Sequence, residues 1–370
     1  MRLACIAFVV ALAAVHAEAQ TSVLPFEVES ADGATIAGQA DAREYARRGV
    51  VVFVAGTGLF DRDVRFGRTG TPRDLLFADL ARRMTARGLA SVRYDRRGLR
   101  YGATGASAID VEVAATSTTT SQREDLAAVY DWARAPEGLG ARCVVIFAHS
   151  EGLLHVGRLA AAGASAPTGI IAMGGLLESP KSVLRWQLTE RDVYSLHLMD
   201  TNGDGRVTNA EVEVSYRNTP SGAFDMIGPF LHPNGVWTSE DLAQLRSNQE
   251  RIYEQQRALA LAEDDNSPYP NSQTPMARYS WWKSWFFDDI PVASQLAGWR
   301  VPMTFHYGDR DSQVNYQRQR ATAGNVFGAQ ASFIVHEGRG HSLGEHPLFG
   351  PIDTAIADQI ADEAATTCPP

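Results

Sequence analysis

The chain has 370 residues, of which 45% are hydrophobic and 21% are charged. This composition is typical of a globular protein that is long enough for one large domain with an insertion. The formal net charge is −9 and the chain has no basic stripe, which argues against a nucleic-acid-binding protein.

The N-terminus carries the pattern of an export signal. Arg2 is followed by an apolar run over residues 3–15, and residues 17–19 (AEA) match a signal-peptide cleavage pattern. We predict a signal peptide over residues 1–19, a mature chain beginning at Gln20, and a periplasmic or extracellular location. The apolar run is shorter than the ~20 residues that span a bilayer, and no later stretch is long enough, so we expect no membrane span.

Three cysteines are present, and Cys5 lies in the predicted signal peptide. An exported protein permits a disulfide between the other two, Cys143 and Cys368. Cys143 opens a predicted strand, where we interpret it as a small buried hydrophobe. Cys368 lies in the C-terminal tail, and we expect the two thiols to stay unpaired.

After the signal, the chain begins with a predicted antiparallel hairpin and then alternates strands with helices. The turn pair Asp32-Gly33 separates two strand patterns at residues 23–30 and 34–40. The strands that follow include continuous apolar runs, which are typical of strands covered on both faces. These further strands are predicted at residues 50–55, 89–94, 144–149, 168–173, 303–307 and 332–336. Helices are predicted at 72–87, 123–133, 313–323 and 352–364.

This alternation predicts an α/β fold with a mostly parallel, eight-stranded sheet and helices on both faces. The alternation is absent between residues 176 and 300, where long helical patterns occur instead. We therefore expect a core formed by residues 20–175 and 301–370. A helical cap over residues 176–300 interrupts it.

A candidate nucleophile, Ser150, lies where a strand turns sharply into a helix. The apolar strand at 144–149 leads into His149-Ser150-Glu151-Gly152, and a helical pattern follows. A serine on a strand–turn–helix junction is the context of a nucleophile elbow, whose backbone holds the serine oxygen out at the top of the sheet. Ala148 stands where the usual motif has glycine, and its small side chain keeps the steric argument.

A serine nucleophile needs a base and an acid that orients the base. Residues 308–314 (GDRDSQV) follow one predicted strand and offer Asp309 and Asp311 as the acid. His341 follows the next strand and is the candidate base. His346 is its rival, although its position beside Pro347 favours a cap or surface role. The chain order Ser, Asp, His is that of α/β-hydrolases.

With these residues in order, the chain resembles the α/β-hydrolase superfamily over roughly residues 21–175 and 275–365. It is most similar to the bacterial esterase-like branch related to dienelactone hydrolases and prolyl-oligopeptidase-type hydrolases. The matching segments are 56–63 (GTGLFDRD), 93–98 (RYDRRG), 149–152 (HSEG), 280–288 (SWWKSWFFD) and 308–314 (GDRDSQV). The resemblance implies Ser150 as nucleophile, His341 as base, and Asp311 in preference to Asp309 as acid.

The oxyanion of such a reaction needs backbone N–H donors. One donor is expected from Glu151, the residue after the nucleophile. The resemblance places the other at Thr57, in the loop after the strand at 50–55, with Gly58 as the alternative. The usual His-Gly of this loop is Ala55-Gly56 here.

Residues 200–211 (DTNGDGRVTNAE) match the calcium loop of an EF-hand in full. Side-chain oxygens at positions 1, 3, 5, 9 and 12 and the backbone carbonyl at position 7 form the predicted Ca²⁺ site, with glycine at position 6 for the sharp turn. The predicted ligands are Asp200, Asn202, Asp204, Arg206, Thr208 and Glu211. We expect this ion to stabilise the cap and no cofactor to take part in the reaction.

EF-hands usually pair, and residues 234–241 (NGVWTSED) copy positions 5 to 12 of a second loop. Positions 1 and 3 would be Phe230 and His232, which are poor ligands, so we interpret this segment as a degenerate, metal-free partner hand. The alternative is a helix start capped by Thr238 or Ser239.

The sequence therefore predicts an exported serine hydrolase of carboxylic esters, with a small-molecule substrate and a calcium-stabilised cap. A peptidase or amidase with the same triad is an alternative, because acyl-transfer chemistry is shared. A non-catalytic calcium-binding module on a hydrolase fold is the third. The aromatic residues of segment 280–288 form the core that docks the cap or line an acyl pocket. They are Trp281, Trp282, Trp285, Phe286 and Phe287.

Overall fold

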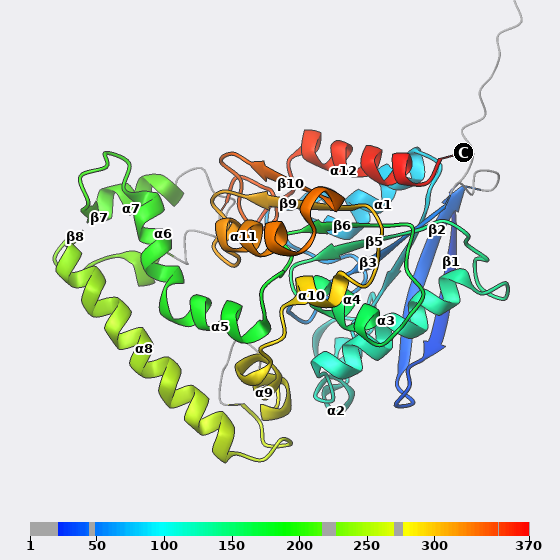
Figure 1. Cartoon of the computed structure of the whole chain (residues 1–370), viewed down its shortest axis with the longest axis horizontal. Helices are drawn as coiled ribbons and strands as arrows, with labels where there is room; N and C mark the ends of the chain where they lie inside the picture. The colour runs from blue at the N-terminus through cyan, green and yellow to red at the C-terminus, as the bar shows by residue number, and fades with distance from the viewer. Residues whose placement is uncertain (1–20, 44–48, 217–226, 270–276, 347, 370) are drawn as a thin grey trace, which may run out of the picture.

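The computed structural model describes residues 21–43, 49–216, 227–269, 277–346 and 348–369. The predicted signal peptide lies outside these residues. An eight-stranded sheet with the order β1-β2-β4-β3-β5-β6-β9-β10 forms the centre (Figure 1). Its strands are β1 (Thr21–Glu29), β2 (Thr35–Arg43), β3 (Val50–Val54), β4 (Ala90–Tyr94), β5 (Val144–His149), β6 (Gly169–Met173), β9 (Met303–Gly308) and β10 (Ala331–His336).

The direction of the strands confirms the expected fold class. β1 pairs antiparallel with β2, and β2 pairs antiparallel with β4, with Gly38 opposite Tyr94. From β4 onward every neighbouring pair is parallel. A mostly parallel sheet with this strand order and an antiparallel second strand is the α/β-hydrolase fold.

Helices cover both faces of the sheet, and the alternation of side chains along the strands explains why. In β3, Val50, Val52 and Val54 belong to one apolar cluster, whereas Val51 and Phe53 belong to another. The first cluster is closed by α3, α4, α10 and α11 and the second by α1 and α12 (Figure 1). These helices are α1 (Leu76–Ala86), α3 (Thr119–Arg134), α4 (Gly152–Ala161), α10 (Val292–Leu296), α11 (Tyr316–Val326) and α12 (Thr354–Thr367). A strand buried on both faces requires apolar residues at every position, which is the pattern seen in the sequence.

The insertion between β6 and β9 is mostly helical, as expected. Its elements are α5 (Pro180–Thr189), α6 (Arg191–Met199), β7 (Val207–Thr208), α7 (Asn209–Tyr216), β8 (Val236–Trp237), α8 (Ser239–Ala262) and α9 (Tyr279–Phe287). α5 to α9 form the cap, which extends to one side of the sheet (Figure 1). α10 already packs on α4 of the core, because a Cβ on Gly157 would lie only 2.8 Å from Val292. The chain therefore returns to the core before residue 300.

The structure overturns the expectation that Cys143 and Cys368 stay unpaired. The two form a disulfide, with their Cα atoms 5.8 Å apart and 225 positions apart in the sequence. Cys143 lies just before β5, and Cys368 caps α12, which packs on that side of the sheet. The sequence could not show that the tail brings Cys368 back to β5.

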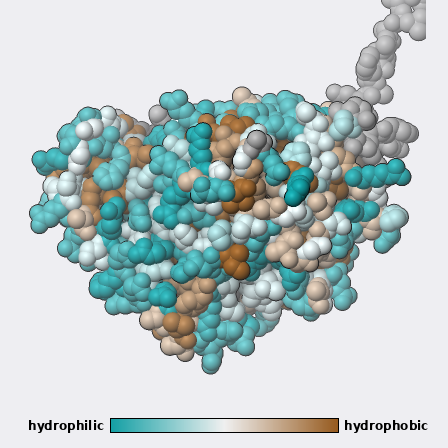
Figure 2. All heavy atoms as spheres, in the orientation of Figure 1, coloured by the Kyte–Doolittle hydropathy of each residue, from teal (hydrophilic) through white to brown (hydrophobic). Residues whose placement is uncertain are grey.

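The face seen in Figure 2 is mostly hydrophilic, with apolar residues in separate small areas. Among the described residues, no helix combines the length and apolarity that a membrane span needs.

Candidate active site

Ser150 occupies a strained turn at the end of β5. Its φ is +56°, a left-handed value that non-glycine residues rarely adopt. The backbone holds it there: the Ser150 N–H donates to the Met173 carbonyl of β6 at 3.0 Å, and Glu151 is the N-cap residue of α4. Gly152 follows because a Cβ there would lie 2.4 Å from the Val54 carbonyl oxygen. The residue types of the predicted elbow thus match a close strand–helix junction.

The loop after β3 approaches the same serine. A Cβ on Gly56 would lie 2.7 Å from the Ser150 Cβ, so only glycine allows this contact. Thr57 follows, and Gly58 has a φ of +141°. We call residues 56–58 the oxyanion loop, because this approach places the predicted donors Thr57 and Gly58 next to the elbow.

Of the two candidate acids, Asp311 contacts the candidate base. Its Oδ2 lies 2.8 Å from the His341 Nδ1, and both side chains are buried. The other oxygen of Asp311 accepts the N–H groups of Gln313 and Val314 at 2.7 and 2.9 Å. Asp309 turns away, and its Oδ1 accepts the Gly338 N–H at 2.8 Å. The structure therefore pairs His341 with Asp311 and gives Asp309 a loop-bracing contact.

His346, the rival base, is buried and has a different part in the structure. Its Nδ1 accepts the N–H groups of Leu348 and Phe349, and burial lowers its pKa to about 4. The predicted surface role is wrong for this buried ring, and α12 begins only at Thr354. His149, before the nucleophile, packs its ring 4.9 Å from the His341 ring, and burial lowers its pKa well below the usual value.

Ser150 and His341 line one pocket together with residues of the cap. The cap contributes apolar Leu184 and Leu188, polar Gln187 and Arg191, and three indoles. The indoles are Trp281, Trp282 and Trp285 of α9, and all three also belong to the main apolar cluster. Phe286 instead packs against Tyr253, with ring centroids 5.7 Å apart. These residues therefore contribute to the core that docks the cap, and the three indoles also line the pocket.

A buried ion pair below the oxyanion loop has no counterpart in the sequence analysis. Arg96 donates from Nη1 to the carbonyls of Gly56 and Gly58 at 2.7 and 2.8 Å, and its Nη2 lies 3.2 Å from Glu151. Burial alone would raise the pKa of Glu151, but the charge of Arg96 outweighs it. With smaller contributions from His155, Thr57 and Trp281, Arg96 holds the pKa of Glu151 below its usual value.

The Arg96–Glu151 pair connects two parts of the site. Arg96 holds the carbonyls of Gly56 and Gly58, on both sides of Thr57, and Glu151, the residue after the nucleophile, joins the elbow to the same loop. The only indication of this ion pair in the sequence was Arg96, which lies in the family-like segment 93–98. The resemblance gave this arginine no role.

The segment predicted to bind calcium forms a tight turn between two helices. α6 enters the loop and α7 leaves it, and Gly203 and Gly205 have φ values of +72° and +77°. Asp200 accepts the N–H groups of Gly203 and Gly205 at 2.8 and 2.9 Å, and Asp204 accepts that of Arg206 at 2.8 Å. Glu211 accepts Thr201 and Thr208 N–H groups. The donor set is all oxygen, which fits Ca²⁺. Within the described ranges, no three His, Cys, Asp or Glu side chains surround one point closely enough to hold a metal.

The second loop pairs with the first. Val207 and Thr208 of β7 pair antiparallel with Trp237 and Val236 of β8. Thr238 and Asp241 form a capping box at the start of α8, so the helix-cap alternative holds as well. Positions 1 and 3 bring no acid: the Phe230 carbonyl accepts the Trp237 indole N–H, and His232 accepts the Asn234 N–H.

The chain was compared with known proteins and with solved structures. No family model and no curated protein matches the chain. Among solved structures it is similar to an esterase from Pyrococcus furiosus, with a TM-score of 0.46, 11% identity, and 94% of this chain and 90% of that chain covered. It is also similar to the esterase domain of a Rhodothermus marinus protein, with a TM-score of 0.45, 14% identity, and 93% and 98% covered. Est1E from Butyrivibrio proteoclasticus gives a TM-score of 0.48, 11% identity, and 92% and 96% covered.

Proposed function

We propose that the protein is a serine hydrolase that cleaves carboxylic esters through an acyl-enzyme. One observation carries the proposal: Ser150, at a strained φ of +56°, lines the same pocket as a histidine whose Nδ1 is held at 2.8 Å by a buried aspartate. A strained serine, an oriented base and glycine-lined access for backbone donors together suit acyl transfer. We also infer from the motifs that the chain belongs with the dienelactone-hydrolase-related branch.

Each chemical step of ester hydrolysis is assigned to a residue of the site. Ser150 Oγ attacks the ester carbonyl carbon while His341 Nε2 takes the hydroxyl proton, and the carbonyl electron pair moves to the oxygen. N–H groups of Glu151 and of Thr57 or Gly58 stabilise that oxyanion. The intermediate then collapses, the C–O bond breaks, and His341 gives its proton to the leaving oxygen. Water repeats the sequence on the acyl-enzyme and releases the acid. Asp311 holds the His341 tautomer throughout.

We propose that residues 200–211 bind Ca²⁺ and that the ion is structural. The six oxygen ligands would be those of Asp200, Asn202, Asp204, Arg206, Thr208 and Glu211. The apolar cluster beneath the two loops includes Leu196, Val207, Val212 and Leu242, so the loop is continuous with the small core of the cap. An ion there would hold α6 and α7 in place and have no part in the bond-breaking steps.

We further propose that the protein is exported. The signal pattern of residues 1–19 supports this, and so does the Cys143–Cys368 disulfide, because such bonds persist in oxidising compartments.

Covalent labelling tests the function most directly. A fluorophosphonate probe should label the wild-type protein at Ser150 and should not label Ser150→Ala. Turnover of p-nitrophenyl esters should fall to background in that variant, while its melting temperature stays close to that of the wild type. Aminoacyl arylamides, offered in the same panel, should be poorer substrates. Faster cleavage of the arylamides would favour a peptidase, and full ester turnover by Ser150→Ala would contradict the mechanism.

A further inference from the structure

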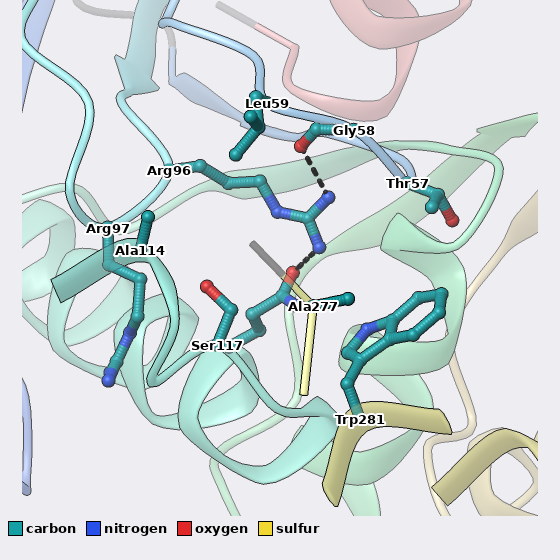
Figure 3. Close-up of a pocket in the computed structure, with 10 residues that line it drawn as sticks. Thr57, Gly58, Leu59, Arg96, Arg97, Ala114, Ser117, Ala277 and Trp281 are labelled. Atoms are coloured by element: carbon teal, nitrogen blue, oxygen red, sulfur yellow. Dashed lines mark hydrogen bonds between the residues drawn. The ribbon is translucent and has the colours of Figure 1, made fainter. Parts of the chain in front are cut away.

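A second pocket adjoins the catalytic pocket, and the two share the wall residues Thr57 and Trp281. Figure 3 shows Thr57 and Trp281 on one side of this second pocket, with Arg96 reaching across it toward Gly58. The rest of its wall comes from the oxyanion loop and Leu59, the segment after β4, the residues that lead into and begin α3, and Ala277 ahead of α9. Its surface is mostly apolar. Because the two pockets share Thr57 and Trp281, a long substrate can extend from the catalytic pocket into this one.

The positive charges in the wall are already neutralised. Arg97 pairs with Asp125 at 2.5 Å and with Asp32 at 2.6 Å. Arg96 donates to two loop carbonyls and pairs with Glu151. A ligand carboxylate would therefore find no uncommitted cation here, and its desolvation would cost free energy without compensation. The pocket suits a neutral, apolar group.

Gln122 contributes a buried polar group to the wall that lacks a partner in the described part of the chain. Its Oε1 accepts a hydrogen bond from Arg96 Nη2. The orientation of the amide is not ambiguous, because arginine has only donors and the facing atom must be the oxygen. Gln122 is only 5% exposed. Its amide nitrogen is buried and has no hydrogen-bond partner in the described part of the chain. A buried, unpaired N–H group costs free energy until an acceptor arrives.

The position of His341 decides which end of an ester would enter. The leaving oxygen must be within hydrogen-bond reach of His341 to receive its proton. His341 and its neighbour Phe66 line the catalytic pocket and are absent from the second one. The alcohol part of the ester therefore remains in the catalytic pocket, and the part that extends past Thr57 belongs to the acyl group.

We propose that the second pocket binds the far end of the acyl group and that the Gln122 amide N–H donates to an oxygen on it. The preferred substrates are then esters of neutral, mainly apolar acids that carry a carbonyl, ether or hydroxyl oxygen some distance from the ester. The proposal rests on the proposed function and names the substrate class of that same site.

Matched pairs of p-nitrophenyl esters test it. Each pair has a plain acyl chain and the same chain with a ketone at the penultimate carbon, from butanoyl to octanoyl. The readout is the ratio of kcat/KM within a pair. At the length that reaches Gln122, wild type should favour the ketone by about threefold to tenfold, the value of one neutral hydrogen bond. Gln122→Glu keeps the shape and the Arg96 contact but removes the donor, and Gln122→Met removes donor and acceptor without adding charge. Both should bring the ratio close to one.

Gln317→Glu, an exposed change of the same charge on α11, should leave the ratio as it is in wild type. Tryptophan fluorescence measures the binding of each pair to Ser150→Ala. The ratio of the two dissociation constants makes the same comparison without requiring turnover. A flat ratio in wild type at every length would overturn the second pocket while leaving the ester hydrolase intact. A preference that survives in both Gln122 variants would also overturn it. Full ester turnover by Ser150→Ala would instead contradict the proposed function, and the binding ratio would still test the pocket.

Discussion

The guanidinium of Arg96 lies 3.2 Å from the carboxylate of Glu151, and that carboxylate is completely buried. The pair connects the residue after the nucleophile to the loop that approaches it, since the same arginine donates to the carbonyls of Gly56 and Gly58. A buried ion pair of this kind is weak evidence for stability, because desolvation offsets the attraction. Its value here lies in fixing the positions of backbone donors.

We therefore expect Arg96→Gln to act mainly on kcat. Without the guanidinium the loop carbonyls lose their partner, and the oxyanion donors move out of position. Losing one such donor costs on the order of 10²- to 10³-fold in kcat. Steady-state kinetics on a short p-nitrophenyl ester measures this, with Arg100→Gln, at an exposed arginine of the same connection after β4, as the control. An Arg96→Gln enzyme with normal kcat and a raised KM would show that the arginine only shapes the pocket.

The second prediction separates the two aspartates. Asp311→Asn should lower kcat by on the order of 10⁴-fold, because an amide stabilises the wrong His341 tautomer. Asp309→Asn should have little effect, since an amide oxygen can still accept the Gly338 N–H. Both variants should fold, as judged by thermal melting. If Asp309→Asn were the damaging change, the assignment of the acid would be wrong.

The third prediction concerns calcium. Affinity of about 10⁻⁴–10⁻³ M, as in extracellular modules, would suffice for a structural ion. Calcium at about a hundred times Kd should stabilise the cap by about 2.7 kcal/mol, so chelation should lower the melting temperature. Glu211→Gln should resemble chelation, and turnover should fall as the cap loosens.

Glu213→Gln, an exposed change two positions along α7, is the matched control and should keep the calcium response. Calorimetry measures binding directly. Equal melting with calcium and with chelator, together with no heat of binding, would rule out the site. Unchanged melting with altered turnover would point to regulation instead.

The fourth prediction concerns acid. Burial lowers the pKa of His155 to about 3 and that of His336 to about 4. The folded protein keeps these rings neutral, whereas the unfolded chain protonates them below about pH 6.5. The unfolded state therefore binds more protons between about pH 6.5 and 4, so stability is full above that window and is lost as pH falls through it. The melting temperature should drop across this range.

His155→Leu should make that decline shallower, because it removes one ring that must be charged on unfolding. The same change at the exposed His197 is the control and should leave the slope as in wild type. Melting temperatures measured from pH 7 to pH 4 give both slopes. An identical slope in His155→Leu and wild type would show that this ring does not govern the acid response.

The sequence by itself determined the features that depend on a short stretch of chain. Ser150 stands in a strand–turn–helix segment whose small residues allow a close junction, and residues 200–211 carry their predicted ligands and turn glycines within one loop. The strands of the sheet were predicted because burial on both faces demands an uninterrupted apolar run, as at β3 and β5. The order of the candidate catalytic residues along the chain, Ser150 then Asp311 then His341, follows from these local patterns.

Only the tertiary structure decided which distant residues meet. Cys143 and Cys368 are 225 positions apart, and their pairing depends on how α12 packs on the sheet. Asp311 and Asp309 follow the same strand, and the direction each side chain takes in the folded loop separates them. Arg96, Gln122, Glu151 and Trp281 come from four segments that no local pattern relates. They meet because the parallel strands place their loops at one edge, where the cap covers them and excludes the water that would otherwise satisfy their polar groups.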